Sequence, residues 1–189
     1  EFANGSDSQR TVYLQIFNAD GSTRTEPSVL RSGTYDHASF LTLEQMSDGR
    51  LAVGGSTRYD YMVTYAELDG SAVGTSVLDF SLQTAEHRLI ALGDTQFLVY
   101  EDDYFSSPWS TEQTHFIELQ RLDDEGLAVE TLRLHEFAPE VDVSYSSVAR
   151  LDADRLAIAA ATDDGVVHLI QYDETTGSST HRALELPFN

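Results

Sequence analysis

The chain has 189 residues, no cysteine, and 32 acidic side chains against 11 basic ones, so its formal net charge is −21 at pH 7. A surface this acidic repels phosphate groups, which excludes nucleic acid and anionic membrane as favoured partners. The lack of cysteine excludes disulfides and thiol catalysis. Because the apolar runs are shorter than the roughly 20 residues of a membrane-spanning helix, no membrane insertion is expected.

The chain is expected to contain one domain, at 11–189, preceded by a disordered or tag-derived tail at 1–10. The domain is predicted to be built of β-strands throughout, because its apolar residues alternate and never follow a helical spacing of three and four. It begins with a hairpin of strands 11–17 and 28–31, and three units of four strands follow. Their predicted strands are 39–46, 50–53, 61–67 and 73–80; 87–92, 96–100, 115–121 and 128–137; and 145–151, 155–161, 166–172 and 180–186.

The turns between these strands recur with a regular period. The glycines of the second turns, Gly21, Gly70, Gly126 and Gly177, follow one another at intervals of about 50 residues. Four strands per such period are typical of propeller blades, whereas a sandwich would not show the periodicity. The predicted fold class is therefore an all-β, propeller-like array of four-stranded antiparallel blades with about three and a half repeats. Such an array leaves an open edge, so we expect self-association or completion by the remainder of a longer chain.

Two stretches resemble known bacterial repeats. The run Asp48-Gly-Arg-Leu-Ala-Val-Gly-Gly-Ser, followed by Met62-Val-Thr-Tyr and Leu68-Asp-Gly, is similar to the delta-sixty type of β-propeller repeat. The run Val12-Tyr-Leu-Gln-Ile-Phe-Asn-Ala-Asp-Gly resembles a stretch common in large secreted, calcium-associated bacterial repeat proteins and adhesins. The resemblance implies a propeller shape and a secreted or surface bacterial protein.

Carboxylates and aromatic rings gather in the segments predicted to lie on one face of the array. In four-stranded blades, the loop after the second strand and the link to the next blade share this face. The longest predicted loop, 101–112, holds the only tryptophan, and long loops often carry function. Rings beside carboxylates suit a sugar or a cationic peptide, while the alternative is a loop that folds its tryptophan over a blade edge. The candidate ligand-binding residues are Tyr35, Asp36, Tyr59, Asp60, Asp102, Asp103, Tyr104 and Trp109.

Metal and catalytic motifs are weak. The acidic pairs Asp152-Ala-Asp154 and Asp163-Asp164 offer hard oxygen ligands for Ca2+ but lack the EF-hand spacing, and the alternative is that they are ordinary turn residues. The six histidines show no paired zinc spacing, and His168 is interpreted as a packed or rim histidine. No nucleophile elbow and no phosphate-binding glycine loop is present.

These patterns favour a non-catalytic binding module of a secreted or surface bacterial protein, which recognises a carbohydrate or peptide on the acidic, aromatic loop face. Two alternatives stay open. The chain could be a structural spacer whose acidity only keeps it soluble. It could also be part of a propeller glycosidase or calcium-dependent hydrolase, in which case a pocket should hold two carboxylates with opposed pKa shifts.

Overall fold

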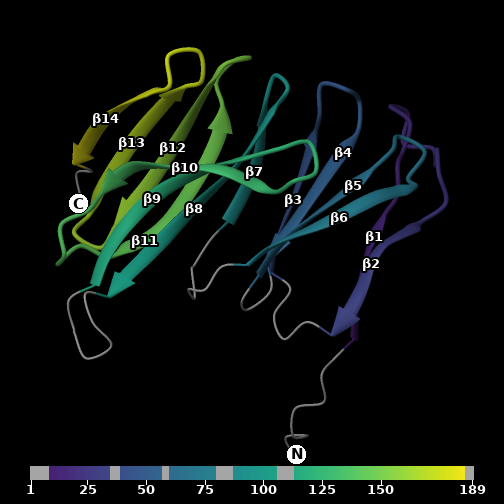
Figure 1. The fold of residues 1–189 in the computed structure, drawn as a ribbon, viewed down its shortest axis with the longest axis horizontal. Coiled ribbons are helices and arrows are strands. Elements are labelled where there is room, and N and C mark those ends of the chain that lie inside the picture. Colours follow the sequence, from purple (N-terminus) through teal and green to yellow (C-terminus); the bar gives the residue numbers. More distant parts are fainter. Residues whose placement is uncertain (1–8, 35–38, 57–59, 80–86, 106–112, 186–189) are drawn as a thin grey trace, which may run out of the picture. The chain divides into compact units, whose positions relative to one another are not determined.

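The computed structural model describes residues 9–34, 39–56, 60–79, 87–105 and 113–185, and these form strands and turns (Figure 1). No helix occurs among them, and hence none that could span a membrane. The all-β prediction is therefore confirmed. The strands are β1 (Gln9–Leu14), β2 (Ser28–Thr34), β3 (Ser39–Gln45), β4 (Leu51–Ser56), β5 (Asp60–Ala66), β6 (Ala72–Asp79), β7 (His87–Leu92), β8 (Thr95–Phe105), β9 (Gln113–Leu122), β10 (Ala128–Glu136), β11 (Val143–Arg150), β12 (Arg155–Thr162), β13 (Val166–Asp173) and β14 (Ser178–Glu185).

The strands pair only with their sequence neighbours, in an antiparallel sense. The hairpin β1–β2 is one sheet, and the strands β3 to β6, β7 to β10 and β11 to β14 form three four-stranded sheets. The predicted grouping of four strands per unit is therefore confirmed. The described residues do not close into a barrel or a propeller, so the structure supports several antiparallel sheets and leaves the propeller arrangement as a proposal.

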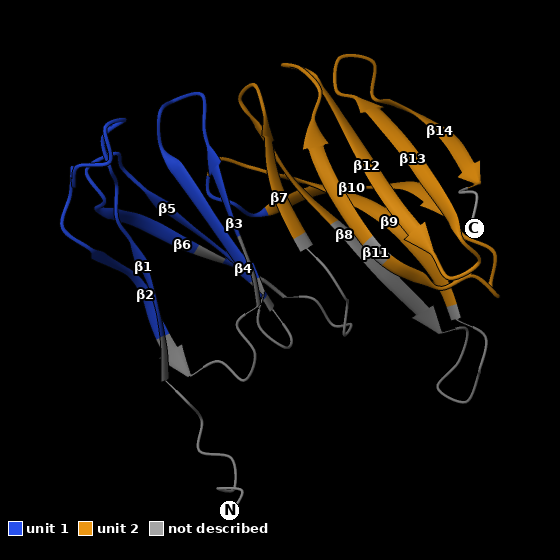
Figure 2. Ribbon diagram, turned by 180° about the vertical axis from the view of Figure 1, so that it is seen from behind, with its two compact units in different colours: residues 1–81, 125–127 blue, residues 82–124, 128–189 orange. Residues whose placement is uncertain are grey.

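The chain divides into two compact units (Figure 2). Unit 1 comprises residues 1–81 and 125–127, and unit 2 comprises residues 82–124 and 128–189. Unit 1 contains the hairpin and the first four-stranded sheet, whereas the other two four-stranded sheets belong to unit 2.

Aspartates shape many of the turns. Asp69 accepts a hydrogen bond from the Ser71 backbone N–H at 2.8 Å, while Gly70 takes the positive φ of 85° that closes the turn. The side chain and backbone N–H of Ser71 lower the pKa of Asp69. The same side-chain contact to the backbone N–H two residues ahead recurs at Asp20, Asp48, Asp152 and Asp164. Some of the acidic side chains therefore stabilise turns.

The core of unit 1 joins its hairpin to its four-stranded sheet. Leu14 and Leu30 of the hairpin pack with Leu51 and Ala66 of the sheet, and all four are buried. The hydroxyl of Ser28 also donates to the backbone carbonyl of Gly70 in the turn after β5.

The strand predicted at 50–53, with a loop from residue 54, was placed too short, because β4 continues to Ser56. Glycine is a poor strand former, but the fully buried ring of Tyr61 lies over Gly54 and fills the space of its missing side chain. The Tyr61 hydroxyl lies 2.9 Å from that of Thr42, on the other side of β4. Gly54 is thus a strand residue that makes room for a tyrosine.

The core of unit 2 lies between its two four-stranded sheets. Ile117 and Leu119 of β9 belong to the same buried cluster as Ile158 of β12 and Ile170 of β13. Phe97 and Tyr172 meet edge to face, with ring centroids 5.8 Å apart. These contacts fix the two sheets of unit 2 face to face.

Candidate functional site

The structure changes the setting of several residues predicted to bind a ligand. Asp102, Asp103 and Tyr104 were expected in the long loop but lie in β8, where their backbones pair with Phe116, His115 and Thr114. The prediction was wrong because the facing residues of β9 supply a full strand partner, and strand pairing outweighs the poor strand propensity of aspartate.

Of the remaining predicted site residues, Asp60 alone lies within the described part of the chain. Asp60 is the first residue of β5 and pairs with Asp79, in unit 1. Asp102, Asp103 and Tyr104 belong to unit 2, so the structure brings these three together as consecutive strand residues. Tyr35, Asp36, Tyr59 and Trp109 lie outside the described residues.

One end of unit 2 gathers exposed carboxylates. β8 ends and β9 begins there, and the backbone N–H of Phe137, just after β10, donates to the carbonyl of His115 at 3.0 Å. Asp142, in the connection to β11, lies with its carboxylate 2.9 Å from Nε2 of the buried His115. The described exposed acids at this end are Glu136, Glu140, Asp142, Asp163 and Asp164.

Two of these acids, Asp142 and Asp163, connect their chain segments by hydrogen bonds. The Asp142 backbone N–H donates to the Asp163 carboxylate at 3.1 Å, and the Asp163 N–H donates to the Asp142 carbonyl at 3.0 Å. This reciprocal pair joins the β10–β11 connection to the β12–β13 turn. The end of the unit therefore presents carboxylates on a fixed frame, which we call the acidic end.

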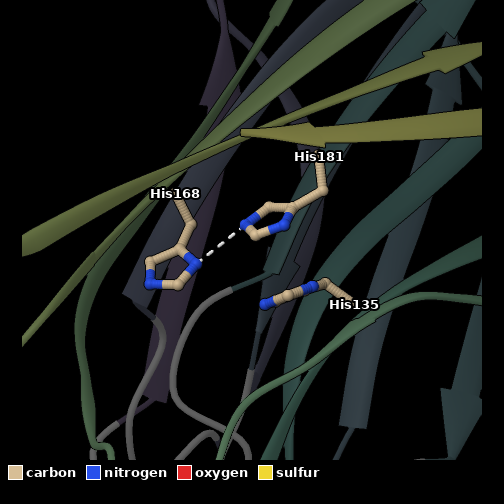
Figure 3. A group of neighbouring side chains, drawn as sticks. All are labelled: His135, His168 and His181. Carbon is tan, nitrogen blue, oxygen red and sulfur yellow. Dashed lines mark hydrogen bonds between the residues drawn. The ribbon is translucent and has the colours of Figure 1, made fainter. Parts of the chain in front are cut away.

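Three histidines from three strands converge near the same end of unit 2 (Figure 3). His135 lies on β10, His168 on β13 and His181 on β14, and one ring nitrogen of each lies within 4.8 Å of the other two. His168 Nδ1 and His181 Nε2 are 2.9 Å apart. The ring of His135 stacks on that of His181 with centroids 4.0 Å apart. We call these residues the histidine cluster.

Strand register places two of these rings on the core-facing side of their sheet. Ile170 of the core pairs directly with His181, and His168 lies two residues before Ile170 on the same strand. Because side chains two apart on a strand share a face, His168 and His181 both point toward the other sheet of unit 2.

A β-bulge brings His135 to meet them. In β10, Leu132 pairs with Leu119 and Arg133 with Glu118, but His135 pairs with Ile117, so Leu134 is an extra residue. Leu119 and Ile117 share the core-facing side of β9, and the bulge therefore returns His135 to that side. Without it, His135 would face away from the other two histidines.

Phe137 supports the cluster from the buried side. This ring is 3% exposed and meets both His135 and His168 edge-on, with centroid distances of 4.6 and 5.0 Å. His135 and His168 are partly buried, whereas His181 is exposed on the edge strand β14. The cluster thus has an apolar floor and an open side toward solvent.

The environment favours the neutral form of His135 and His168. Burial, together with the nearby imidazoles of His181 and His168, lowers the pKa of His135 to about 4. Burial and His181 also lower the pKa of His168, and the carboxylate of Asp164 partly offsets this effect. Neutral imidazole is the form that coordinates metal ions.

Sequence reasoning interpreted His168 as a packed or rim histidine, and its partial burial at the edge of the core agrees with that. It did not foresee the cluster, because the three residues are far apart along the chain. Part of the signal was readable, since a hairpin that turns near Gly177 pairs His168 with Ala183 and Ile170 with His181, which makes the two histidines diagonal neighbours on one face of the hairpin. The bulge that brings His135 to them has no mark in the sequence.

The acidic pairs considered for Ca2+ take part in turn contacts. Asp152 accepts a hydrogen bond from Arg155 Nε at 2.8 Å and one from the Asp154 backbone N–H at 3.2 Å. Asp164 accepts from the Thr162 hydroxyl at 2.6 Å. Their carboxylates therefore have a structural role, and calcium binding stays a prediction.

Among the described residues, the one group of three or more histidine, aspartate or glutamate side chains close enough to share a metal ion is the histidine cluster. No protein-family model matches the chain, and comparison with curated proteins finds no significant relative.

Proposed function

We propose that this chain is a non-catalytic binding module that takes a carbohydrate or peptide ligand at its strand ends, with its four-stranded sheets arranged as propeller blades. The observation that carries the proposal is the acidic end of unit 2, where five exposed carboxylates lie at the end of β10 and on two following connections that Asp142 and Asp163 join by hydrogen bonds. Fixed groups bind with less loss of conformational entropy than mobile ones. A preorganised set of acceptors is therefore suited to recognition.

The charge of this end favours a peptide with basic residues over a neutral sugar. Glu140 and Asp163 are exposed, and the whole chain has 32 acidic residues, so a cationic ligand gains attraction at long range as well as in contact. A carbohydrate would depend more on the aromatic residues predicted for the same face, above all Trp109.

The remaining features of the proposal extend the fold and its setting. A repeated meander of four strands supports the propeller arrangement, and its open edges support self-association or completion by further blades. We place the module in a secreted or surface bacterial protein because of its repeat resemblance and its acidity, and such surroundings would supply Ca2+.

A structural spacer is the second candidate. It is favoured by the turn aspartates, since Asp20, Asp48 and Asp69 each accept a hydrogen bond from the backbone two residues ahead. If most carboxylates exist to form turns and maintain solubility, the acidic end would bind nothing.

Binding arrays separate these candidates. The wild type is applied to glycan and basic-peptide arrays, and hits are measured by titration against the double variant Glu140→Gln/Asp163→Asn. We expect this variant to weaken peptide binding at least tenfold, because asparagine keeps the Asp163 oxygen that accepts from Asp142 but loses the charge. The matched control is Asp124→Asn, an exposed acid in the turn after β9 at the other end of the sheet.

Each outcome decides between the candidates. Glycan hits that Trp109→Ala abolishes would assign a carbohydrate ligand, and peptide hits weakened by the double variant would assign a basic peptide. No hit on either array, or equal losses in the double variant and in Asp124→Asn, would overturn the binding proposal and leave the spacer.

A further inference from the structure

We propose that the histidine cluster is a binding site for a divalent transition metal, with Zn2+ as the ion that fits it best. The site is formed within unit 2 by His135, His168 and His181. It is formed by other residues than the acidic end, although Asp164 of that end acts on His168 through its charge.

The donor set selects the class of metal. Three imidazoles are borderline-soft nitrogen ligands, which suit Zn2+, Cu2+ and Ni2+ and offer no oxygen to Ca2+ or Mg2+. Among the described residues the group contains three histidines and no carboxylate. Three histidines with a fourth position open to solvent are a common arrangement for zinc.

The distances are within reach of small side-chain movements. Zinc–nitrogen bonds of about 2.0–2.1 Å in a tetrahedral site separate the ligand nitrogens by roughly 3.3 Å. His168 Nδ1 and His181 Nε2 point at each other at 2.9 Å, so they must part by a few tenths of an ångström. Metal coordination replaces the single proton that the two imidazoles share in this hydrogen bond.

His135 makes the larger adjustment. Its ring stacks on His181 with an interplanar angle of 28°, and it must turn so that a nitrogen, not the ring face, points to the metal. The three candidate ligand nitrogens, one from each ring, all lie within 4.8 Å of one another, so the required shift is on the order of 1–2 Å. The exposed side of the cluster at His181 leaves room for this movement.

The surroundings favour a bound cation. Phe137 closes the buried side and restricts the positions of His135 and His168, which lowers the entropy lost on coordination. The carboxylate of Asp164 acts on His168 through its negative charge. The net charge of −21 attracts cations to the whole molecule.

A metal here would connect two sheets. His135 is on β10, the edge strand of one sheet, while His168 and His181 are on the last two strands of the other. Coordination by all three would cross-link β10 to β13 and β14 within unit 2, so we infer a structural role for the ion as a clamp between the sheets.

The test is metal titration of the full chain after removal of metals with a chelator. Zn2+ is titrated calorimetrically in a buffer with excess Ca2+, which occupies exposed carboxylates, and Co2+ is titrated in parallel because its visible absorption reports nitrogen coordination in a tetrahedral site. We expect one Zn2+ per chain, and a loss of affinity of at least about 100-fold in His181→Ala and in His168→Ala. Thr180→Ala, beside His181 on the opposite face of β14, is the matched control and should bind as the wild type does.

The result can contradict the proposal in two ways. If the wild type binds no Zn2+ under these conditions, or if both histidine variants bind it as tightly as the wild type, the cluster is a packed set of imidazoles only. Because His181 is exposed on an edge strand, its alanine variant is expected to fold, which circular dichroism checks. Failure on the binding arrays would leave this result unaffected, so the two proposals are tested separately.

Discussion

The replacement of Gly54 by alanine tests the fit between β4 and the tyrosine that covers it. A Cβ atom at Gly54 would lie 1.9 Å from Tyr61 Oη, 2.7 Å from Tyr61 Cζ and 2.7 Å from Thr42 Oγ1. Ordinary contacts between carbon atoms are about 3.5 Å or longer. The Tyr61 ring is fully buried and cannot swing into solvent, so the ring and its neighbours must shift by more than 1 Å.

The cost follows from these contacts. Overpacking a buried site typically costs about 1–3 kcal/mol, and losing the Tyr61–Thr42 hydrogen bond adds about 1 kcal/mol. The lower entropy of the unfolded alanine chain returns about 0.5–1 kcal/mol. We therefore expect Gly54→Ala to lower the free energy of unfolding by about 1–3.5 kcal/mol.

Urea unfolding measures the change, with Gly74→Ala as the matched control. Gly74 also lies in a strand of the same sheet, but it is exposed and a Cβ there meets no atom within 4 Å. The control should match the wild type or exceed it by up to about 1 kcal/mol. Tyr61→Phe removes the nearest atom of the clash, so the double variant Gly54→Ala/Tyr61→Phe should cost less than the sum of the single changes. If Gly54→Ala is as stable as the wild type, the proposed clash is refuted. The same holds if the free-energy changes of the two single variants add up to that of the double variant.

Three further predictions concern unit 2. Glu174→Ala removes the carboxylate that lies 2.9 Å from the Arg121 guanidinium and 3.0 Å from the Tyr172 hydroxyl. Urea unfolding should show that the free energy of unfolding falls by about 1–3 kcal/mol. A fall of less than about 0.5 kcal/mol would contradict this. In chelated protein, His135 has a lower pKa when folded than when unfolded, so the unfolded chain binds the proton first and stability should fall from pH 6.5 toward pH 5. The stability of His135→Gln should fall less over this pH range. If stability changes equally with pH in the variant and the wild type, the pKa of His135 is not low. Excess Zn2+ should raise the thermal midpoint of the wild type but not that of His181→Ala, and a rise in both would mean that the ion stabilises the fold elsewhere.

The strand pattern could be predicted from the sequence because two local signals agree. Apolar residues alternate, and an aspartate followed by glycine closes many of the turns, as at Asp69 and Gly70. The strand expected at 87–92 coincides with β7, and most other boundaries moved by one to three residues. Local chemistry therefore determines which strands are neighbours in each sheet.

The errors arose where a distant partner decides the local structure. Gly54 and Gly55 looked like a loop, but they lie in β4 because Tyr61 fills the space above Gly54. Asp102 and Asp103 looked like a loop edge, but β9 pairs with them. In both cases a cross-strand partner outweighs a poor intrinsic strand propensity, and single-residue preferences do not contain that partner.

The histidine cluster could not be predicted from the sequence, for a different reason. In a regular strand, the face on which a side chain lies depends on whether its position is odd or even, so Leu132 and His135 should lie on opposite faces. The extra residue Leu134 reverses this and points both into the core side of the sheet. A bulge follows from the packing of β10 against its neighbour, which no pattern within the strand records. The convergence of His135 with His168 and His181 thus depends on one inserted residue, and a site formed in this way can be recognised only after the strands are placed in register.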